Sequence, residues 1–186
     1  MENTKDRMDE LCKIKFKQVR LRRFELGDEA DVYEYSSDPV VFKYLTWCGL
    51  TERSQVRRFI ERCYVHNPWV FAIIHKATEK CIGAIELKVN MEQKKASVGY
   101  LLNRKFWEKG IMSELVQKCV AFCFEELKLE LIEATHFAGN FASGRVLVKA
   151  GFEVDIRVHQ QVKVKEHFFE EIYYSLSKEK YCKMKK

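Results

Sequence analysis

The chain has 186 residues, 47% of them apolar and 13% aromatic, which is enough material for one substantial hydrophobic core. Its formal net charge of +6 would assist binding to any polyanion, but charge alone does not choose among nucleic acid, an acidic surface and a phosphorylated ligand. A polar N-terminus and the lack of an apolar run of about 18 residues argue against a secretory signal and a membrane-spanning helix. We therefore expect a soluble, cytoplasmic protein without a membrane partner.

Two prolines, eight glycines and no low-complexity tract predict a single domain over residues 1–186, with its core at about 19–181 and basic, polar ends. The basic residues concentrate in Lys13–Arg23 and Lys178–Lys186. We interpret both segments as solvated ends, with a nucleic-acid-binding arm as the alternative. The seven cysteines form no C-x-x-C pair and no cluster with histidines, so we expect reduced thiols, mostly buried, and no metal.

The N-terminal part of the chain predicts a strand followed by helices. Apolar and basic residues alternate in Val19–Arg22, the pattern of a half-buried strand. Gly27-Asp28 supplies a turn and an N-cap for a short helix over 30–35. Asp38-Pro39 begins a second helical region, and apolar residues recur at helical spacing beyond Thr51.

Three apolar runs with short connections then predict an antiparallel meander: Trp69–Lys76, Cys81–Val89 and Ala96–Leu102. The most regular helical pattern follows at Ile111–Leu127, where Cys119 and Cys123 lie four residues apart on the apolar face. The remaining predicted elements are a strand at Leu129–Phe137, a helix at Phe141–Lys149 closed by Gly151, and strands at Phe152–Gln160 and His167–Leu176. The expected order is βααβββαβαββ.

One strand-to-helix junction carries a basic loop with a glycine at Gly110. Unpaired amides at the start of the following helix and the positive end of its dipole suit a phosphate, with added attraction from Arg104, Lys105 and Lys109. A plain structural turn would also explain one glycine. No P-loop and no Gly-x-Gly-x-x-Gly pattern is present, which argues against kinase-like and dinucleotide-binding sites.

A second junction, His136–Phe152, also leads from a strand through a polar loop into a helix. With both junctions, the chain resembles the GCN5-related N-acetyltransferase (GNAT) superfamily over roughly Val19 to Tyr181, and within it the branch of RimJ/RimL-type ribosomal-protein N-terminal acetyltransferases. The first family motif, Gly-Tyr-(Trp/Leu)-Leu and then Trp-Gly-(Lys)-Gly-(Tyr/Ile)-(Ala/Met)-(Thr/Ser)-Glu, is similar to Gly99–Leu102 and Trp107–Glu114. Glu108 replaces a frequent glycine, and Met112 replaces a small residue.

The second family motif is Asn-x-x-Ser-x-x-(Val/Leu)-(Leu/Tyr)-x-Lys-x-Gly-Phe. It is matched by Asn140, Ser143, Val146, Leu147, Lys149, Gly151 and Phe152. Two such motifs at the family's separation are much more specific than either alone.

The resemblance implies an α/β fold, with a mixed, mostly antiparallel central sheet that is flanked by helices and splayed at an acyl-coenzyme A site. It implies acetyl-coenzyme A as cofactor, with the pantetheine arm on the backbone of Tyr100, Leu101 and Leu102. The loop residues implied to contact the cofactor are Trp107, Glu108, Lys109, Gly110, Ile111, Met112 and Ser113, with the pyrophosphate on the amides from Glu108 to Ser113. From the second motif, Asn140, Ser143 and Arg145 are expected to contact the cofactor.

The activity implied is transfer of an acetyl group to a primary amine by direct attack in a ternary complex. A backbone N–H near Leu101 is expected to polarise the carbonyl. Many superfamily members protonate the departing thiolate with a tyrosine where this chain has Leu147, so Ser143 is the expected substitute, with a capping hydroxyl as the alternative. The branch often has a glutamate where this chain has Ser97.

Glu86 and His136 are further candidates for proton transfer, each weighed against an ordinary structural role. For the acceptor, the resemblance suggests Tyr44 and Trp47 as lining residues. The acceptor is a protein N-terminus or a small-molecule amine, and the protein is expected to be a monomer or a homodimer. The alternatives are a catalytically weak acyl-coenzyme A-binding regulatory module and, with no recognised motif to support it, a basic nucleic-acid-binding protein.

Overall fold

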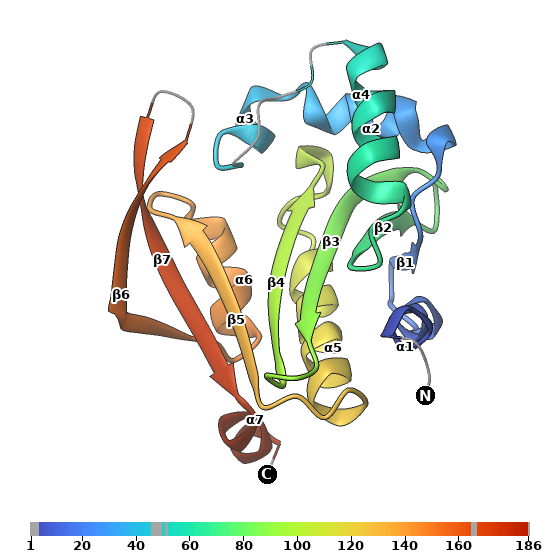
Figure 1. Cartoon of the computed structure of the whole chain (residues 1–186). Helices are drawn as coiled ribbons and strands as arrows, with labels where there is room; N and C mark the ends of the chain where they lie inside the picture. The colour runs from blue at the N-terminus through green and yellow to red at the C-terminus, as the bar shows by residue number, and fades with distance from the viewer. Residues whose placement is uncertain (1–3, 46–49, 51, 165–166, 186) are drawn as a thin grey trace. The chain divides into compact units, whose positions relative to one another are not determined.

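The computed structural model describes residues 4–45, 50, 52–164 and 167–185 (Figure 1). Its α-helices are α1 (Thr4–Asp9), α2 (Glu29–Ser36), α3 (Pro39–Phe42), α4 (Arg53–Phe59), α5 (Ile111–Glu125), α6 (Phe141–Lys149) and α7 (Lys178–Met184). Shorter turns are η1 (Glu10–Lys13), η2 (Leu26–Asp28) and η4 (Arg104–Phe106), which are 3-10 helices, and η3 (Ile60–Val65), a π-helix. The strands are β1 (Val19–Arg22), β2 (Val70–His75), β3 (Cys81–Asn90), β4 (Lys95–Leu102), β5 (Leu131–Phe137), β6 (Glu153–Val164) and β7 (His167–Ser177).

Within the described residues the strands form one mixed sheet in the hydrogen-bonded order β1-β2-β3-β4-β5-β7-β6. The chain divides into two compact units, residues 1–86 with 100–111 and residues 87–99 with 112–186, here called unit 1 and unit 2. None of the described helices is long and apolar enough to cross a membrane. The predicted strands and helices between residues 19 and 177 are confirmed, with small shifts at their ends.

The core of unit 1 forms where α2, α4 and η3 pack on the antiparallel strands β2 and β3. The first five residues of β2 are all buried, so this strand lacks the alternation of a half-exposed strand. Val32, Tyr35, Val56 and Ile60 pack with it at 1% exposure or less. The helical spacing seen in the sequence thus places one face of each helix on the sheet.

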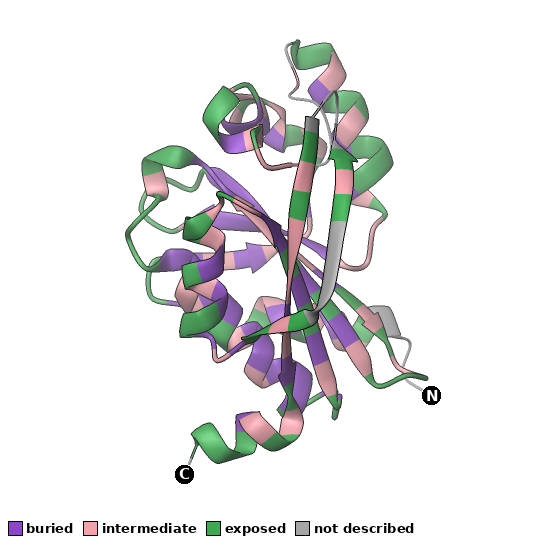
Figure 2. Ribbon diagram, turned by 90° about the vertical axis from the view of Figure 1, so that its left-hand side faces the viewer, coloured by how far each residue is buried: buried purple, intermediate pink, exposed green. Residues whose placement is uncertain are grey.

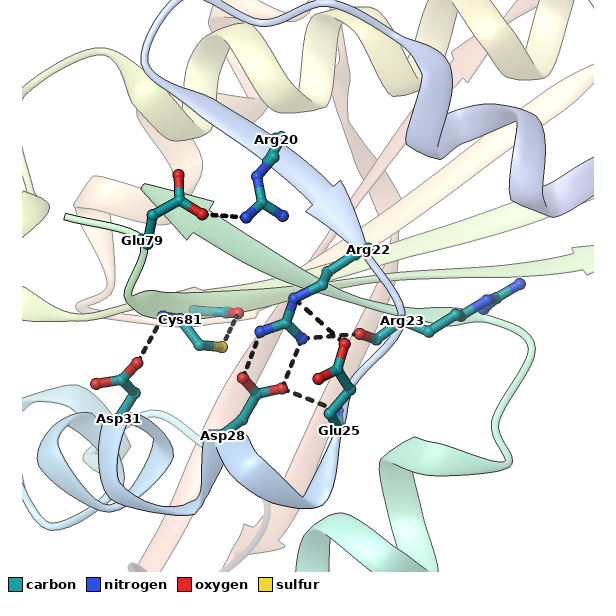
Figure 3. Close-up of polar contacts among 9 residues, drawn as sticks. Arg20, Arg22, Arg23, Glu25, Asp28, Asp31, Glu79 and Cys81 are labelled. Atoms are coloured by element: carbon teal, nitrogen blue, oxygen red, sulfur yellow. Dashed lines mark hydrogen bonds and ion pairs between the residues drawn. The ribbon is translucent and has the colours of Figure 1, made fainter. Parts of the chain in front are cut away.

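A polar network fixes the start of α2 to the sheet in unit 1 (Figure 3). Asp28, predicted as a turn residue, accepts two hydrogen bonds from the Arg22 guanidinium at 2.6 and 2.8 Å and a third from the Glu25 amide at 2.9 Å. One turn later, Asp31 accepts the backbone N–H of Cys81 at 2.8 Å. The pKa of Arg22 is raised, chiefly by its hydrogen bonds to Asp28. These contacts set the position of α2, which matters for the loop described below.

Unit 2 contains the long helix α5 and the strands β5, β7 and β6, which pair antiparallel in that order. Cys119 and Cys123 are buried in its core, and burial raises the pKa of Cys123 to about 12. The parallel register of β4 with β5 runs from Lys95↔Leu131 to Ser97↔Glu133, although the described residues of both strands continue beyond it. Parallel pairing therefore stops early, as expected of a splayed sheet.

The two ends of the chain are more structured than the predicted basic, polar ends. Near the N-terminus, α1 and η1 bury Met8 and Leu11 completely. At the C-terminus, Ser177 caps α7 by accepting the Lys180 amide at 3.3 Å, and Tyr181 packs on Phe124 with ring centroids 4.9 Å apart. The other residues of this last helix are exposed or of intermediate exposure, as the green and pink of its ribbon in Figure 2 show. The sequence did not predict these terminal helices because their apolar residues are isolated among charged ones.

Candidate functional site

The loop that joins β4 to α5 is closed by its own hydrogen bonds. The side chain of Asn103 accepts the Lys105 amide at 3.0 Å, and the amides of Phe106 and Trp107 continue the turn η4. The Trp107 indole N–H then donates to the Leu102 carbonyl at 2.7 Å. The loop therefore has a defined conformation in the protein by itself.

The backbone changes hand repeatedly just before α5. Trp107 has φ −68°, Glu108 has φ +61° and Gly110 has φ +76°, whereas Lys109 is not left-handed. Trp107 itself is extended, with ψ 159°, so the left-handed residues are Glu108 and Gly110. Left-handed residues in a loop can turn neighbouring N–H groups toward one side and form a concave anion-binding surface. It leads directly into Ile111, the first residue of a 15-residue helix whose first amides have no partner within the helix.

Glu108 and Gly110 occupy these left-handed positions for different reasons. Gly110 has open space around its Cα, so only its φ requires glycine. Glu108 holds a conformation that a side chain disfavours, at the position where the resembling family often has glycine. The loop thus keeps its shape at a cost in local strain.

Two of the three basic residues predicted in the loop, Lys105 and Lys109, contact other side chains of unit 1. The Lys105 ammonium lies 2.8 Å from Glu34 of α2. The Lys109 ammonium lies 5.0 Å from the centre of the Phe106 ring, and its carbonyl accepts a hydrogen bond from Gln18 at 3.2 Å. Arg104 is exposed. Of the predicted cations, Lys105 therefore has a carboxylate partner that the sequence did not reveal.

The end of β4 has a definite orientation relative to β3. Asn103 donates its amide to the Ile82 carbonyl at 2.7 Å, and the Leu101 carbonyl lies so close to Gly83 that an added Cβ would be 2.4 Å from it. Because the N–H and C=O of one strand residue point to the same side, Leu101 and Asn103 face β3 while Tyr100 and Leu102 face away. For the oxyanion donor expected near Leu101, this orientation leaves the amides of Tyr100 and Leu102 facing away from β3. Gly83, which allows the close approach, was not singled out in the sequence.

At the second junction, in unit 2, the predicted residues build the start of α6. The Asn140 side chain accepts the Ser143 amide at 3.3 Å and so caps the helix. Ser143 is half-buried in the first turn, and Arg145 is exposed. Leu147 is completely buried, so its side chain belongs to the core.

His136 is 8% exposed and both of its ring nitrogens are hydrogen-bonded. Nδ1 lies 2.9 Å from the Phe137 carbonyl, which can only accept, so Nδ1 carries the proton. Nε2 lies 3.1 Å from the Tyr174 hydroxyl and accepts its proton when the ring is neutral. Gly144 packs directly on this pair, since a Cβ there would lie 2.8 Å from Nε2. These contacts favour the structural alternative for His136, and the sequence did not indicate Tyr174 or Gly144 as its partners.

Glu86 is half-buried on β3, opposite Val70 of β2. The pKa of the neighbouring Tyr64 is raised mainly by burial, with a further contribution from the charge of Glu86. Tyr64, on η3, was not predicted as a site residue. Tyr44 is half-buried with the Lys43 ammonium 5.1 Å from its ring centre, whereas Trp47 lies outside the described residues.

No group of three potential metal ligands occurs among the residues that the structure describes. Cys81, Cys119 and Cys123 are buried free thiols, while Cys63 and Cys182 are exposed. Burial raises the pKa of Cys81 to about 12, which makes it a poor nucleophile.

Comparison with known proteins agrees with this geometry. Residues 18–153 match the model of the family described as "Acetyltransferase (GNAT) domain". The chain is 32% identical to the uncharacterized N-acetyltransferase p20 of Bacillus licheniformis over 170 residues, covering 89% of this chain and 96% of p20.

Two solved structures have a similar fold. The GNAT-family acetyltransferase of Bacillus anthracis has a TM-score of 0.78 and 28% identity, covering 89% of this chain and 98% of its own. The spermidine N-acetyltransferase of Vibrio cholerae, solved with CoA and spermine, has a TM-score of 0.72 at 17% identity, covering 89% and 98%. The second likeness concerns the fold alone. From the family match and these relatives, the chain belongs to the GNAT acetyltransferase family and is an N-acetyltransferase, a class whose fold implies the use of an acyl-coenzyme A.

Proposed function

We propose that this enzyme transfers the acetyl group of acetyl-coenzyme A to a primary amine by direct attack in a ternary complex. The observation that carries the proposal is the alternation of backbone hand at Glu108 and Gly110 immediately before the N-terminus of α5. Such a surface suits a pyrophosphate held mainly by main-chain amides. The enzyme is further proposed to be cytoplasmic, as a monomer or a homodimer.

The cofactor would contact three parts of the chain, each considered by itself. The backbone of Tyr100 and Leu102 would pair with the pantetheine arm, because these residues face away from β3. The amides from Glu108 to Ser113 would hold the pyrophosphate. Asn140, Ser143 and Arg145 would supply the remaining contacts, with Asn140 acting chiefly through the cap that sets the first turn of α6.

The chemistry requires a neutral amine, a donor for the developing oxyanion and a proton for the departing thiolate. Deprotonating an α-amine of pKa near 8 at pH 7 costs about 1 kcal/mol, whereas a lysine side chain costs about 4.6 kcal/mol. Glu86 would accept the proton directly or through water, and an outward-facing amide such as that of Leu102 would polarise the carbonyl. Since Leu147 has no proton to give, Ser143 or water would protonate the thiolate.

The acceptor is proposed to be a peptide or protein N-terminal α-amine, as in the RimJ/RimL branch that both motifs resemble. The lower cost of deprotonating an α-amine supports this choice, because it demands less of Glu86. Tyr44 and Trp47 are proposed to line the acceptor site. A small-molecule amine is the second candidate, since a protein of the same fold is named as a spermidine N-acetyltransferase.

The first test is a calorimetric titration of the purified protein with acetyl-coenzyme A, beside a Gly110→Pro variant. Proline fixes φ near −65°, which is incompatible with the +76° of Gly110, so the variant should lose micromolar binding. Gly27→Ala is the control, because Gly27 also has open space but no left-handed φ. Absence of binding to folded wild-type protein would overturn the proposal and direct attention to the nucleic-acid alternative.

If the cofactor binds, thiol release will identify the acceptor. A peptide with a free N-terminus, the same peptide N-acetylated, and spermidine should be compared at equal concentration. Turnover with the free peptide alone supports the N-terminal assignment, turnover with spermidine alone replaces it, and binding without turnover on any amine favours a regulatory module.

A further inference from the structure

Glu34, on the face of α2 that points to the β4–α5 loop, collects three donors from separate parts of unit 1. Its carboxylate accepts the Lys105 ammonium at 2.8 Å, the Asn103 side-chain amide at 3.1 Å and the Lys80 ammonium at 3.2 Å. The donors come from the loop, from the end of β4 and from the turn before β3. The Glu34 carboxylate of α2 thus contacts the first residues of the β4–α5 loop.

Asn103 transmits this contact to the backbone of the loop. It is 6% exposed, and its side-chain nitrogen is bound to Glu34 while its side-chain oxygen accepts the Lys105 amide. Its own backbone N–H is bound to the Ile82 carbonyl. Because the two ends of one amide group have opposite hydrogen-bonding roles, Glu34 fixes which way the Asn103 oxygen points. That orientation in turn caps η4.

The far end of the loop is held independently. Gln18 donates to the Lys109 carbonyl at 3.2 Å, and the Phe106 ring lies 4.9 Å from the ring of His75. The segment between Asn103 and Gly110 is therefore anchored at both ends, and the Glu34 anchor is ionic. Glu34 of α2, which is distant from the loop in the sequence, thus helps to hold the conformation of this loop.

We propose that Glu34 is a positioning residue for cofactor binding: it holds the Asn103–Lys105 segment so that the amides of the following loop are preorganised for the pyrophosphate. The assignment rests on the proposed function of the loop. Glu34 acts through Asn103 and Lys105 and need not touch the cofactor. Loss of its charge would leave the loop to be ordered at the moment of binding, which lowers affinity.

The test compares Glu34→Gln with Glu79→Gln. Glu79 also forms an ion pair in unit 1, with Arg20 of β1 and not with a residue of the loop, and so controls for loss of one surface charge. Glu34→Gln should weaken coenzyme A binding about tenfold, with a smaller effect from Glu79→Gln. In the ligand-free Glu34→Gln variant, the backbone amides of residues 104–110 should exchange faster than in wild type, while the rest of the protein exchanges as before. A role of Glu34 in global stability alone would not produce this local change.

A Lys105→Met variant completes the design. If Glu34 acts through Lys105, the loss of coenzyme A affinity in the double variant Glu34→Gln/Lys105→Met should be smaller than the sum of the two single losses. Unchanged affinity and unchanged loop exchange in Glu34→Gln, with wild-type protein binding normally, would overturn this proposal and leave the proposed function standing. Equal weakening by Glu79→Gln would also overturn it. Failure of the wild type to bind coenzyme A would instead overturn the function of the loop, and this proposal with it.

Discussion

The two junctions that carry the family motifs differ in what holds them. At the first, Asn103–Gly110, we propose that backbone amides bind the pyrophosphate, and side chains from distant segments of the chain stabilise the loop conformation. At the second, His136–Gly144, the Asn140 side chain caps α6, and Gly144 packs this helix on His136 of β5 and Tyr174 of β7. Residues of a functional motif can therefore serve the site through backbone shape at one place and through ordinary packing at another.

The second junction should therefore be sensitive to a small added side chain. In Gly144→Ala, the new methyl would lie 2.8 Å from His136 Nε2 and 3.1 Å from the Tyr174 hydroxyl, so the helix or the pair must shift. We expect a loss of about 2 kcal/mol in the free energy of unfolding, as for other overpacked sites. Urea denaturation would measure it, with Gly27→Ala as the unstrained control.

A second variant keeps this prediction specific. His136→Ala removes the atom that the methyl would meet, so the double variant should lose less stability than the sum of the two single losses. Full additivity, or an unchanged Gly144→Ala, would show that α6 does not pack on the His136–Tyr174 pair as described.

The positions of both junctions could be predicted from the sequence, because strand and helix patterns meet there and Gly110 and Asn140 mark the turns. Their partners could not. Glu34 lies 69 residues before Asn103, and nothing local distinguishes it from any other glutamate on a helix. The orientation of Leu101 depends on how β4 registers with β3 at Gly83, which periodicity does not determine. Terminal helices were missed for a related reason: Tyr181 and Met8 are apolar anchors that only tertiary packing makes visible.

The contribution of Glu34 at the first junction to protein stability should depend on pH. The hydrogen bonds from Lys105 and Asn103 lower the pKa of Glu34 from 4.5 to about 2. A carboxylate with a depressed folded pKa stabilises the protein fully above pH 4.5, and the contribution is lost as the pH falls toward 2. Because the side chain is partly solvated, we expect this contribution to be about 1 kcal/mol, well below what the shift alone would give.

Unfolding of wild type and Glu34→Gln in urea at pH 6 and at pH 3 would measure it. The wild type should be the more stable of the two at pH 6, and the difference should narrow by roughly half of that contribution at pH 3, because the folded carboxylate is protonated only near pH 2. If the stability difference between wild type and Glu34→Gln widened on acidification, the pKa of Glu34 could not be lowered in the folded protein. Glu79→Gln again controls for removal of an exposed charge.

The smallest expected effect separates strain from charge within the loop itself. Glycine at position 108 would relieve a left-handed backbone costing about 1–2 kcal/mol but would add about 0.5–1 kcal/mol of unfolded-state entropy, so Glu108→Gly should stabilise the protein by about 0.5 kcal/mol. Glu108→Gln keeps the strained φ of +61° and removes only the negative charge. If the loop binds a pyrophosphate, both variants should bind coenzyme A more tightly than wild type, because both remove a carboxylate beside the proposed anion site, but only the glycine variant should melt at a higher temperature. Tighter binding in the glycine variant alone would assign the effect to backbone shape, and weaker binding in both would place the anion elsewhere.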